Sequence, residues 1–152
     1  MSTTTIAAPD LNQRPPRSPR VRLGGYGLLP RALDKGRAEI VGKNGPYHYA
    51  CPVDQQFLNF VGISAEALRE QLALGKGDGE ILDWINENAA HKRQPWEIAA
   101  WSAFQETRSP GDVDSKEWFL GEVRNISTTR TDIVSIADYL DADDHISYGG
   151  KA

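Results

Sequence analysis

The segment from Arg14 to Arg31, RPPRSPRVRLGGYGLLPR, contains the densest positive charge of the chain. Guanidinium groups bind phosphate or carboxylate through paired hydrogen bonds, and glycine amides in a tight turn can add an anion-binding nest. The sequence therefore offers a hypothetical anion site made of six arginines: Arg14, Arg17, Arg20, Arg22, Arg31 and Arg37. The alternative, which we favour, is that the segment straps across the domain while its arginines pair with the chain's own carboxylates.

A second stretch, YHYACPVD, places a thiol close to an imidazole. Cys51 precedes a predicted helix start at Pro52, and helix amides stabilise a thiolate there. Asp54 would orient His48 beside such a nucleophile. The alternative is structural and is favoured, because cysteine is mostly a small buried apolar residue. The sequence thus predicts a possible pocket with four members: Tyr26, His48, Tyr49 and Cys51.

The sequence contains no motif that indicates a metal-binding or cofactor-binding site. The three histidines are far apart in sequence, and neither a His-x-x-x-His nor a Cys-x-x-Cys pattern occurs. The acidic run Asp141, Asp143 and Asp144 has no glycine turn or distal glutamate that would complete a calcium loop. We interpret this run as a solvated helix end that closes the chain, and we predict no metal and no cofactor.

Charge and composition restrict the class of protein. Residues 1–37 contain seven Lys and Arg against two Asp, a net charge of +5. The whole chain has a net charge of −4, so the remainder carries −9. This balance makes nucleic acid an unlikely partner, because phosphate binding needs a broad positive surface. The single cysteine excludes an internal disulfide, and no apolar run approaches the roughly 20 residues that span a bilayer. The expected location is the cytoplasm, without a membrane segment.

The elements that must position these residues are short helices separated by turn signals. Pro30, Pro52 and Pro95 suit first helical turns, and Ser64 suits an N-cap. Further starts are expected at Asp78 as an N-cap, at Asp114 or Ser115, and after Asp132. The helix from Pro95 is apolar over so wide an arc that we predict Trp96, Trp101 and Phe104 at the centre of the core.

The predicted architecture is all-α, a single compact domain of about seven short helices with an extended Arg/Pro-rich N-terminal arm. Period-two alternation is not sustained anywhere, which argues against strands. The expected division is a disordered N-terminus at 1–9, a basic arm packed on the domain at 10–28, a helical domain at 29–145 and a flexible C-terminus at 146–152.

Four stretches together resemble a known family: RPPRSPRVRLGGY, LPRALDKGRA, YHYACPVDQQFLNFVGIS and GDGEILDWI. They resemble a family of small bacterial proteins classified only as a domain of unknown function. The resemblance extends from Asp10 to Ala89 and more loosely into the remaining helices. It implies a helical fold that includes the arm, and it implies no activity, cofactor or functional residue.

Two function classes follow, and whether the protein is an enzyme stays open. The leading hypothesis is a helical module that binds a protein partner, or a second copy of itself, through the basic arm and the first helix. The alternative is a small enzyme or small-molecule binder for an anionic ligand, either phosphate or carboxylate. In that case Arg20, Arg22 and Arg31 hold the anion, and His48 with Tyr26 or Tyr49 supplies acid–base chemistry.

Overall fold

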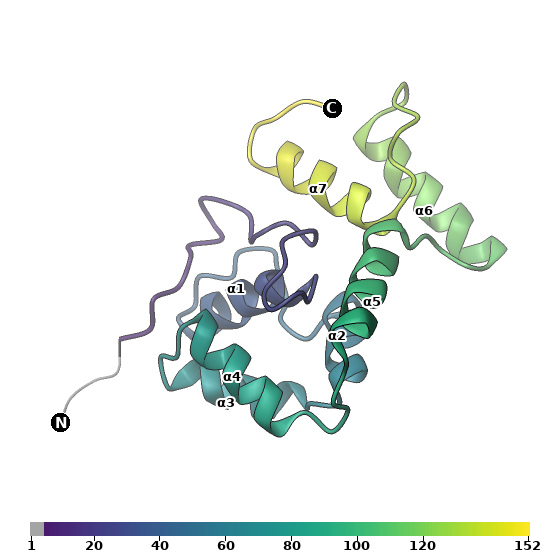
Figure 1. Cartoon of the computed structure of the whole chain (residues 1–152). Helices are drawn as coiled ribbons and strands as arrows, with labels where there is room; N and C mark the ends of the chain where they lie inside the picture. The colour runs from purple at the N-terminus through teal and green to yellow at the C-terminus, as the bar shows by residue number, and fades with distance from the viewer. Residues whose placement is uncertain (1–4) are drawn as a thin grey trace.

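The computed structural model of the protein describes residues 5–152, which form seven α-helices and no β-strand (Figure 1). In chain order the helices are α1 (Leu29–Ile40), α2 (Pro52–Val61), α3 (Ala65–Ala73), α4 (Asp78–Asn88), α5 (Pro95–Thr107), α6 (Val113–Ile126) and α7 (Ile136–Ser147). Among these residues one isolated antiparallel bridge joins Leu23 to Tyr26. The predicted all-α domain of about seven helices is confirmed.

Local sequence signals set most of the helix starts. Pro30, Pro52 and Pro95 lie in the first turns of α1, α2 and α5, where their missing N–H groups leave no unmade helical hydrogen bond. Ser64 caps α3, its hydroxyl accepting a 3.1 Å hydrogen bond from the Ala67 N–H. Gly62 ends α2 at a φ of 71°, a conformation that favours glycine. The helix starts predicted from Pro30, Pro52, Pro95 and Ser64 are confirmed.

Three predicted helix starts are wrong by a few residues. Asp78 is the first residue of α4 and does not cap it; Gly77 precedes the helix. Asp112 caps α6 through the Ser115 N–H at 2.8 Å, in place of the predicted Asp114 or Ser115. Ser135 caps α7, and its hydroxyl accepts a hydrogen bond from the Asp138 N–H. In each case the sequence offers several capping residues close together, and only backbone geometry selects one of them.

The predicted acidic chain end is also wrong. α7 continues to Ser147, so Asp141, Asp143 and Asp144 all lie inside a helix. Asp144 is buried, with 6 % of its surface exposed, and is therefore not part of a solvated end. Its ion pair with an arginine, described below, explains how a carboxylate is tolerated at that position.

The main core lies between α1, α2, α3 and α4, and the turn before α1 adds Tyr26 and Leu28. Gly36 shows how closely α1 and α3 pack, because a Cβ at that position would lie 2.6 Å from Leu72 Cδ1. The cluster contains twelve buried residues: Tyr26, Leu28, Leu29, Leu33, Phe57, Leu58, Val61, Leu68, Leu72, Ile81, Ile85 and Ala89.

A second, smaller core lies between α6 and α7. It contains four buried residues, Phe119, Val123, Ile133 and Ala142. The Phe119 and Tyr139 rings meet edge to face at 5.9 Å. In Figure 1 α6 and α7 lie together at one end of the molecule, away from α3 and α4.

The prediction that the Trp96–Phe104 stretch forms the centre of the core is wrong. Trp96 is 71 % exposed and Phe104 is 55 % exposed, whereas Ser102 and Gln105 are the buried residues of α5. The Ser102 hydroxyl donates to Gly25 O at 2.7 Å and accepts from the Gly27 N–H at 2.9 Å. These polar bonds orient the helix with one edge on the core. Trp101 does reach the core and stacks on Phe60.

The arm, residues 10–28, runs beside α1 and reaches the region between α1 and α7 (Figure 1). Leu11 is fully buried, and its N–H donates to Lys43 O at 2.8 Å. Of the predicted disordered segment 1–9, residues 1–4 lie outside the described residues, and residues 5–9 have no regular secondary structure. None of the helices in the described range has the length and apolar character needed to cross a membrane.

Candidate functional site

Three of the four arginines of the arm bind carboxylates of the same chain. Arg17 pairs with Asp34 at 3.0 Å and with Asp78 at 2.7 Å, and Arg20 pairs with both Asp138 and Asp141. The hydrogen bonds from Arg17, with help from Arg37, hold the pKa of Asp78 below its usual value. Arg22 pairs with Glu106 at 2.8 Å. Each of these guanidinium groups already has an anion.

The two arginines of α1 are also paired. Arg31, buried to 4 % side-chain exposure, binds Asp144 at 2.7 Å, and Arg37 binds Asp78 at 2.7 Å. The Tyr47 hydroxyl donates to the same Asp144 carboxylate at 2.7 Å. Burial, followed by this carboxylate, raises the pKa of Tyr47, so the phenol stays protonated. α1 is thus tied to α7 by a buried, fully bonded ion pair.

The six predicted anion-binding arginines therefore do not surround one open site. Five of them are spread over ion pairs with α1, α4, α5 and α7. Arg14 lines a hollow with Arg17, but there Arg17 is already paired with Asp34. The Gly27 amide, part of the predicted nest, is bonded to Ser102. This arrangement matches the strap interpretation of the arm.

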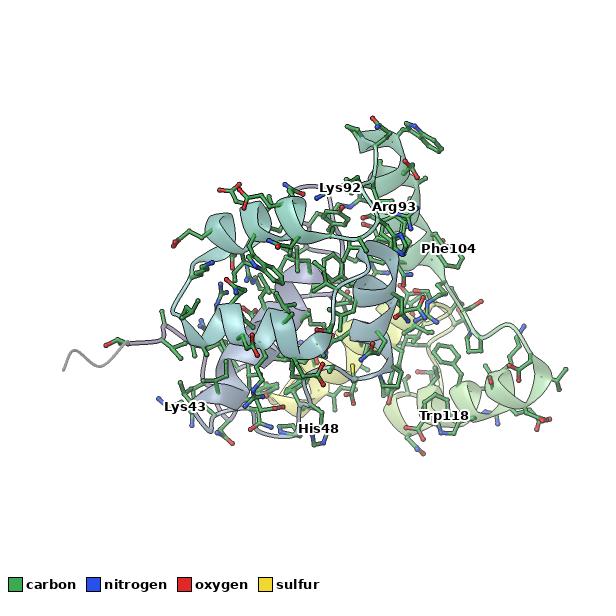
Figure 2. The ribbon with its side chains drawn as sticks, turned by 90° about the horizontal axis from the view of Figure 1, so that it is seen from below. Lys43, His48, Lys92, Arg93, Phe104 and Trp118 are labelled. Atoms are coloured by element: carbon green, nitrogen blue, oxygen red, sulfur yellow. The ribbon has the colours of Figure 1, made fainter. Side chains whose placement is uncertain are left out.

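The four predicted pocket residues separate into two pairs. Tyr26 belongs to the main core and meets Phe57 edge to face at 5.3 Å, while the Tyr49 hydroxyl donates to Ala65 O at 2.8 Å. His48 and Cys51 do line one hollow of about 270 Å³, which Arg31, Lys35 and Tyr47 also line. His48 is exposed and lies at the outer edge of the molecule in Figure 2.

The sequence suggests that Asp54 orients His48, but in the structure Asp54 has other partners. Its Oδ2 accepts the Ala50 N–H at 2.9 Å, and its Oδ1 lies 2.9 Å from Lys35 Nζ. Lys35 Nζ also donates to Cys51 Sγ at 3.2 Å. The side chains of Lys35 and Asp54 are only 4 % and 1 % exposed. The partner of the thiol is therefore a buried lysine and not the histidine.

A different, mostly apolar hollow lies between α2, α6 and α7. It measures about 330 Å³ and adjoins a second hollow of about 600 Å³ near the α5–α6 loop. We call the two together the Trp118 groove, because Trp118 lines both of them and is 64 % exposed. The apolar lining is Pro52, Val53, Phe104, Pro110, Trp118, Phe119, Ile136 and Leu140. Figure 2 shows Phe104 and Trp118 on the same side of the molecule.

One cation faces this groove. Arg108 lines both hollows, and its Nε donates to Gln105 Oε1 at 3.3 Å. No carboxylate of the described residues forms an ion pair with it, in contrast to Arg17, Arg20 and Arg22 of the arm and to Arg31 and Arg37 of α1. Burial alone lowers the pKa of Arg108. Its charge is thus partly desolvated without a compensating anion, a state that binding of an anion would relieve.

The other polar residues of the groove are Gln56 and Tyr139 in the smaller hollow and Ser109, Asp112 and Ser115 in the larger one. The Tyr139 hydroxyl donates to Glu122 at 3.2 Å, and burial is the main cause that raises its pKa to about 12. Within residues 5–152 no group of three or more His, Cys, Asp and Glu side chains could hold a metal ion. The smaller hollow therefore offers apolar contact and one positive charge, whereas the Asp112 carboxylate of the larger hollow is hydrogen-bonded to Ser115.

Sequence reasoning missed both Lys35 and Arg108. A lysine in an amphipathic helix is usually solvated, and nothing local indicates that Asp54 lies against it. Arg108 follows a helix end and precedes Ser-Pro-Gly, which is typical of a surface loop. The sequence does show that none of the three residues after Arg108 is Asp or Glu. The groove itself, however, is formed by helices that are far apart in the sequence.

The amino-acid sequence is similar to that of a described protein family. The model of a family described as "Domain of unknown function (DUF5069)" matches residues 13–146. A comparison with curated proteins found no match. The family match covers most of the arm, all of α1 to α6 and nearly all of α7.

Proposed function

The chain belongs to this family of unknown function, and from its own residues we propose that it is a helical module that binds an anion with an apolar body in the Trp118 groove. No chemical reaction is part of the proposal. It keeps the anionic-ligand hypothesis of the sequence and moves the site from the arm to Arg108.

One observation supports the proposal above all others, and it is the unpaired guanidinium of Arg108. Eight other arginines of the described residues have carboxylate partners: Arg17, Arg20, Arg22, Arg31, Arg37, Arg69, Arg93 and Arg130. Arg14, Arg108 and Arg124 have none within the described range. Arg14 and Arg124 are exposed, whereas Arg108 is partly buried and faces a groove that a ligand could enter. A hydrogen bond to a charged group contributes about 1.5–3 kcal/mol, enough to orient a ligand.

The apolar side chains that line the groove determine the chemistry of the ligand beyond its charged group. Val53, Phe119, Ile136 and Leu140 present apolar surface, and sites of about 300–1,000 Å³ with a few polar groups are typical of small-molecule binding. A carboxylate at Arg108 with an alkyl or aryl body along these side chains satisfies both features. Inorganic phosphate alone would leave the apolar lining exposed to water.

The test uses decanoate and its uncharged analogue decanamide as probes. Binding is followed by NMR through the indole N–H of Trp118. We expect decanoate to bind more tightly than decanamide, and Arg108→Gln to reduce this preference about tenfold, because the charge-assisted bond is lost. Arg14→Gln is the matched control, since Arg14 lies on the arm, and it should leave the preference unchanged. An unchanged preference in Arg108→Gln would contradict the proposal.

A second candidate function is binding to another protein or to a second copy of the chain. It is supported by exposed apolar side chains that are concentrated in one part of the described chain. Six of the nine large ones fall between residues 96 and 134: Trp96, Phe104, Val113, Trp118, Leu120 and Val134. Apolar patches with aromatic residues are typical of interaction surfaces.

Sedimentation equilibrium at rising protein concentration tests the self-association form of this candidate. An increase in mass that the double variant Trp96→Ser/Phe104→Ser abolishes would support it. Leu74→Ser is the control, because Leu74 is also exposed (61 %) but lies after α3. A monomer at every concentration would remove self-association. We place either form of binding in the cytoplasm, which the single cysteine favours.

A further inference from the structure

Lys35, Cys51 and Asp54 form a buried cluster that the proposed function does not use. Lys35 comes from α1, Cys51 is the N-cap of α2, and Asp54 lies in the first turn of α2. The ammonium Nζ lies 3.2 Å from the sulfur and 2.9 Å from Asp54 Oδ1. That Oδ1 is fully buried and accepts no hydrogen bond of good geometry. The ammonium is therefore shared between the carboxylate and the thiol.

From this arrangement we propose that Cys51 and Lys35 form a reversible sulfur–nitrogen cross-link, a sulfenamide, when the protein meets a hydroperoxide. The proposal does not depend on the Trp118 groove. It rests on an amine and a thiol held next to each other, with the thiol at the wall of an open hollow.

Access and reactivity both favour Cys51. The residue is partly exposed and lines the hollow of about 270 Å³, so a molecule as small as hydrogen peroxide can reach the sulfur. The thiolate is the form that oxidants attack, and a neighbouring ammonium and a helix N-terminus both stabilise negative charge on sulfur. The first oxidation product is a sulfenic acid.

The chemistry has two steps, and its atoms balance. In the first step the thiolate sulfur attacks one peroxide oxygen, the O–O bond breaks, and the leaving hydroxide takes a proton from the Lys35 ammonium to give water. In the second step the neutral Lys35 amine attacks the sulfenic sulfur, the S–N bond forms, and the S–OH group leaves as water with an amine proton. The net change joins one thiol and one amine, consumes one hydrogen peroxide and releases two waters. Sulfur is oxidised by two electrons and peroxide is reduced.

Competing partners for the sulfenic acid are scarce. Cys51 is the only cysteine of the sequence, so an internal disulfide cannot form. Sulfenic acids condense with a nearby thiol or nitrogen, and the nitrogen at 3.2 Å is that of Lys35. The product would join α1 to α2, and an excess of a small thiol would reverse it through a mixed disulfide.

The experiment treats the reduced full chain with hydrogen peroxide and measures the intact mass. We expect a loss of about 2 Da, restored by dithiothreitol, because two hydrogens leave and no oxygen stays. Proteolysis should then yield a peptide pair joined through Lys35 and Cys51. Cys51→Ser should show no change. Lys43→Met should cross-link like the natural chain, because Lys43 is an exposed lysine at the molecular surface (Figure 2).

Lys35→Met separates the cross-link from simple oxidation. We expect it to gain about 16 or 32 Da and to lose no mass, since the sulfur then keeps oxygen. The peptide map of the natural chain decides the question even where this variant does not fold, because it needs no substitution. Oxygen addition alone, an intermolecular disulfide alone, or no reaction in the natural chain would each overturn the proposal.

Discussion

The part of the chain from the arm to α4 and the part from α5 to α7 are stabilised in different ways. The first buries twelve residues in one apolar cluster, whereas α6 and α7 share a cluster of four. Large apolar side chains remain outside in the second part, most clearly Trp96 and Trp118. A small core leaves apolar side chains without partners in the chain, so the proposed binding surface lies where burial is least complete.

The connection between α7 and the first part is largely polar, whereas α5 also packs Trp101 on the main core. Arg20 and Arg31 bind three carboxylates of α7, namely Asp138, Asp141 and Asp144. The Ser102 hydroxyl attaches α5 to the glycine turn. Directional bonds of this kind fix the position of α7 without covering the Trp118 groove. The comparison therefore predicts that α7 is held by charge and that α1 to α4 are held by packing.

The largest expected effect concerns the ion pair between the parts. Arg31→Met leaves Asp144 buried without its charge partner, and the free energy of unfolding should fall by about 4 kcal/mol. The double variant Arg31→Met/Asp144→Leu should recover most of this loss, because no unpaired charge remains. Urea unfolding monitored by circular dichroism measures both variants. A loss below about 1 kcal/mol in the single variant would show that α7 is held mainly by something other than this pair.

Substitution of one isoleucine in each core allows the packing of the two cores to be compared directly. Ile85 lies in the large cluster and is fully buried; Ile133 lies in the small cluster and is 4 % exposed. We expect Ile85→Ala to cost about 3 kcal/mol and Ile133→Ala about 2 kcal/mol, since the smaller cluster can relax around the cavity. The same denaturant titration applies. Equal or reversed costs would mean that the small core is packed as tightly as the large one.

The smallest effect is a pH dependence at Asp78. Its pKa is lowered in the folded chain, chiefly by hydrogen bonds from Arg17, so it binds a proton less readily when folded than when unfolded. Its contribution is therefore present above about pH 4 and is lost as the pH falls through the lowered value. Asp78→Asn should cost about 1 kcal/mol at pH 7, because the site is partly exposed, and the difference should shrink below pH 4. Thermal melts of the natural chain and of Asp78→Asn from pH 7 to pH 3 provide the measurement. A stability difference between the two that grows on acidification would contradict the prediction.

The sequence predicted the helices well because their signals are local. The first-turn prolines and the Ser64 cap need only neighbouring residues to act, and the structure confirms them. The position of α5 could not be predicted in the same way. Its apolar residues surround the helix, so periodicity does not select a buried face, and the choice is made by Ser102 and its bonds to a turn 75 residues earlier.

The candidate site was partly predictable. Cys51 and His48 were predicted as members of one pocket, and both line one hollow; the partner of the sulfur, Lys35, was not foreseen. The lysine is buried because Asp54 compensates its charge, and this depends on how α1 packs against α2. Arg108 was missed for a related reason, because what distinguishes it is that it lacks a carboxylate partner and also lines an apolar groove, and a sequence does not show distances.

The pairing of Arg20 has a consequence for synthesis of the chain. Its carboxylate partners follow it by 118 and 121 residues, so at roughly 10 residues per second a ribosome makes them more than about ten seconds after the arginine. During that time the large apolar core can form, since its members end at Ala89. The nascent chain therefore carries Arg20 and Arg31 without their carboxylate partners until α7 emerges, and these contacts close after the large core can form.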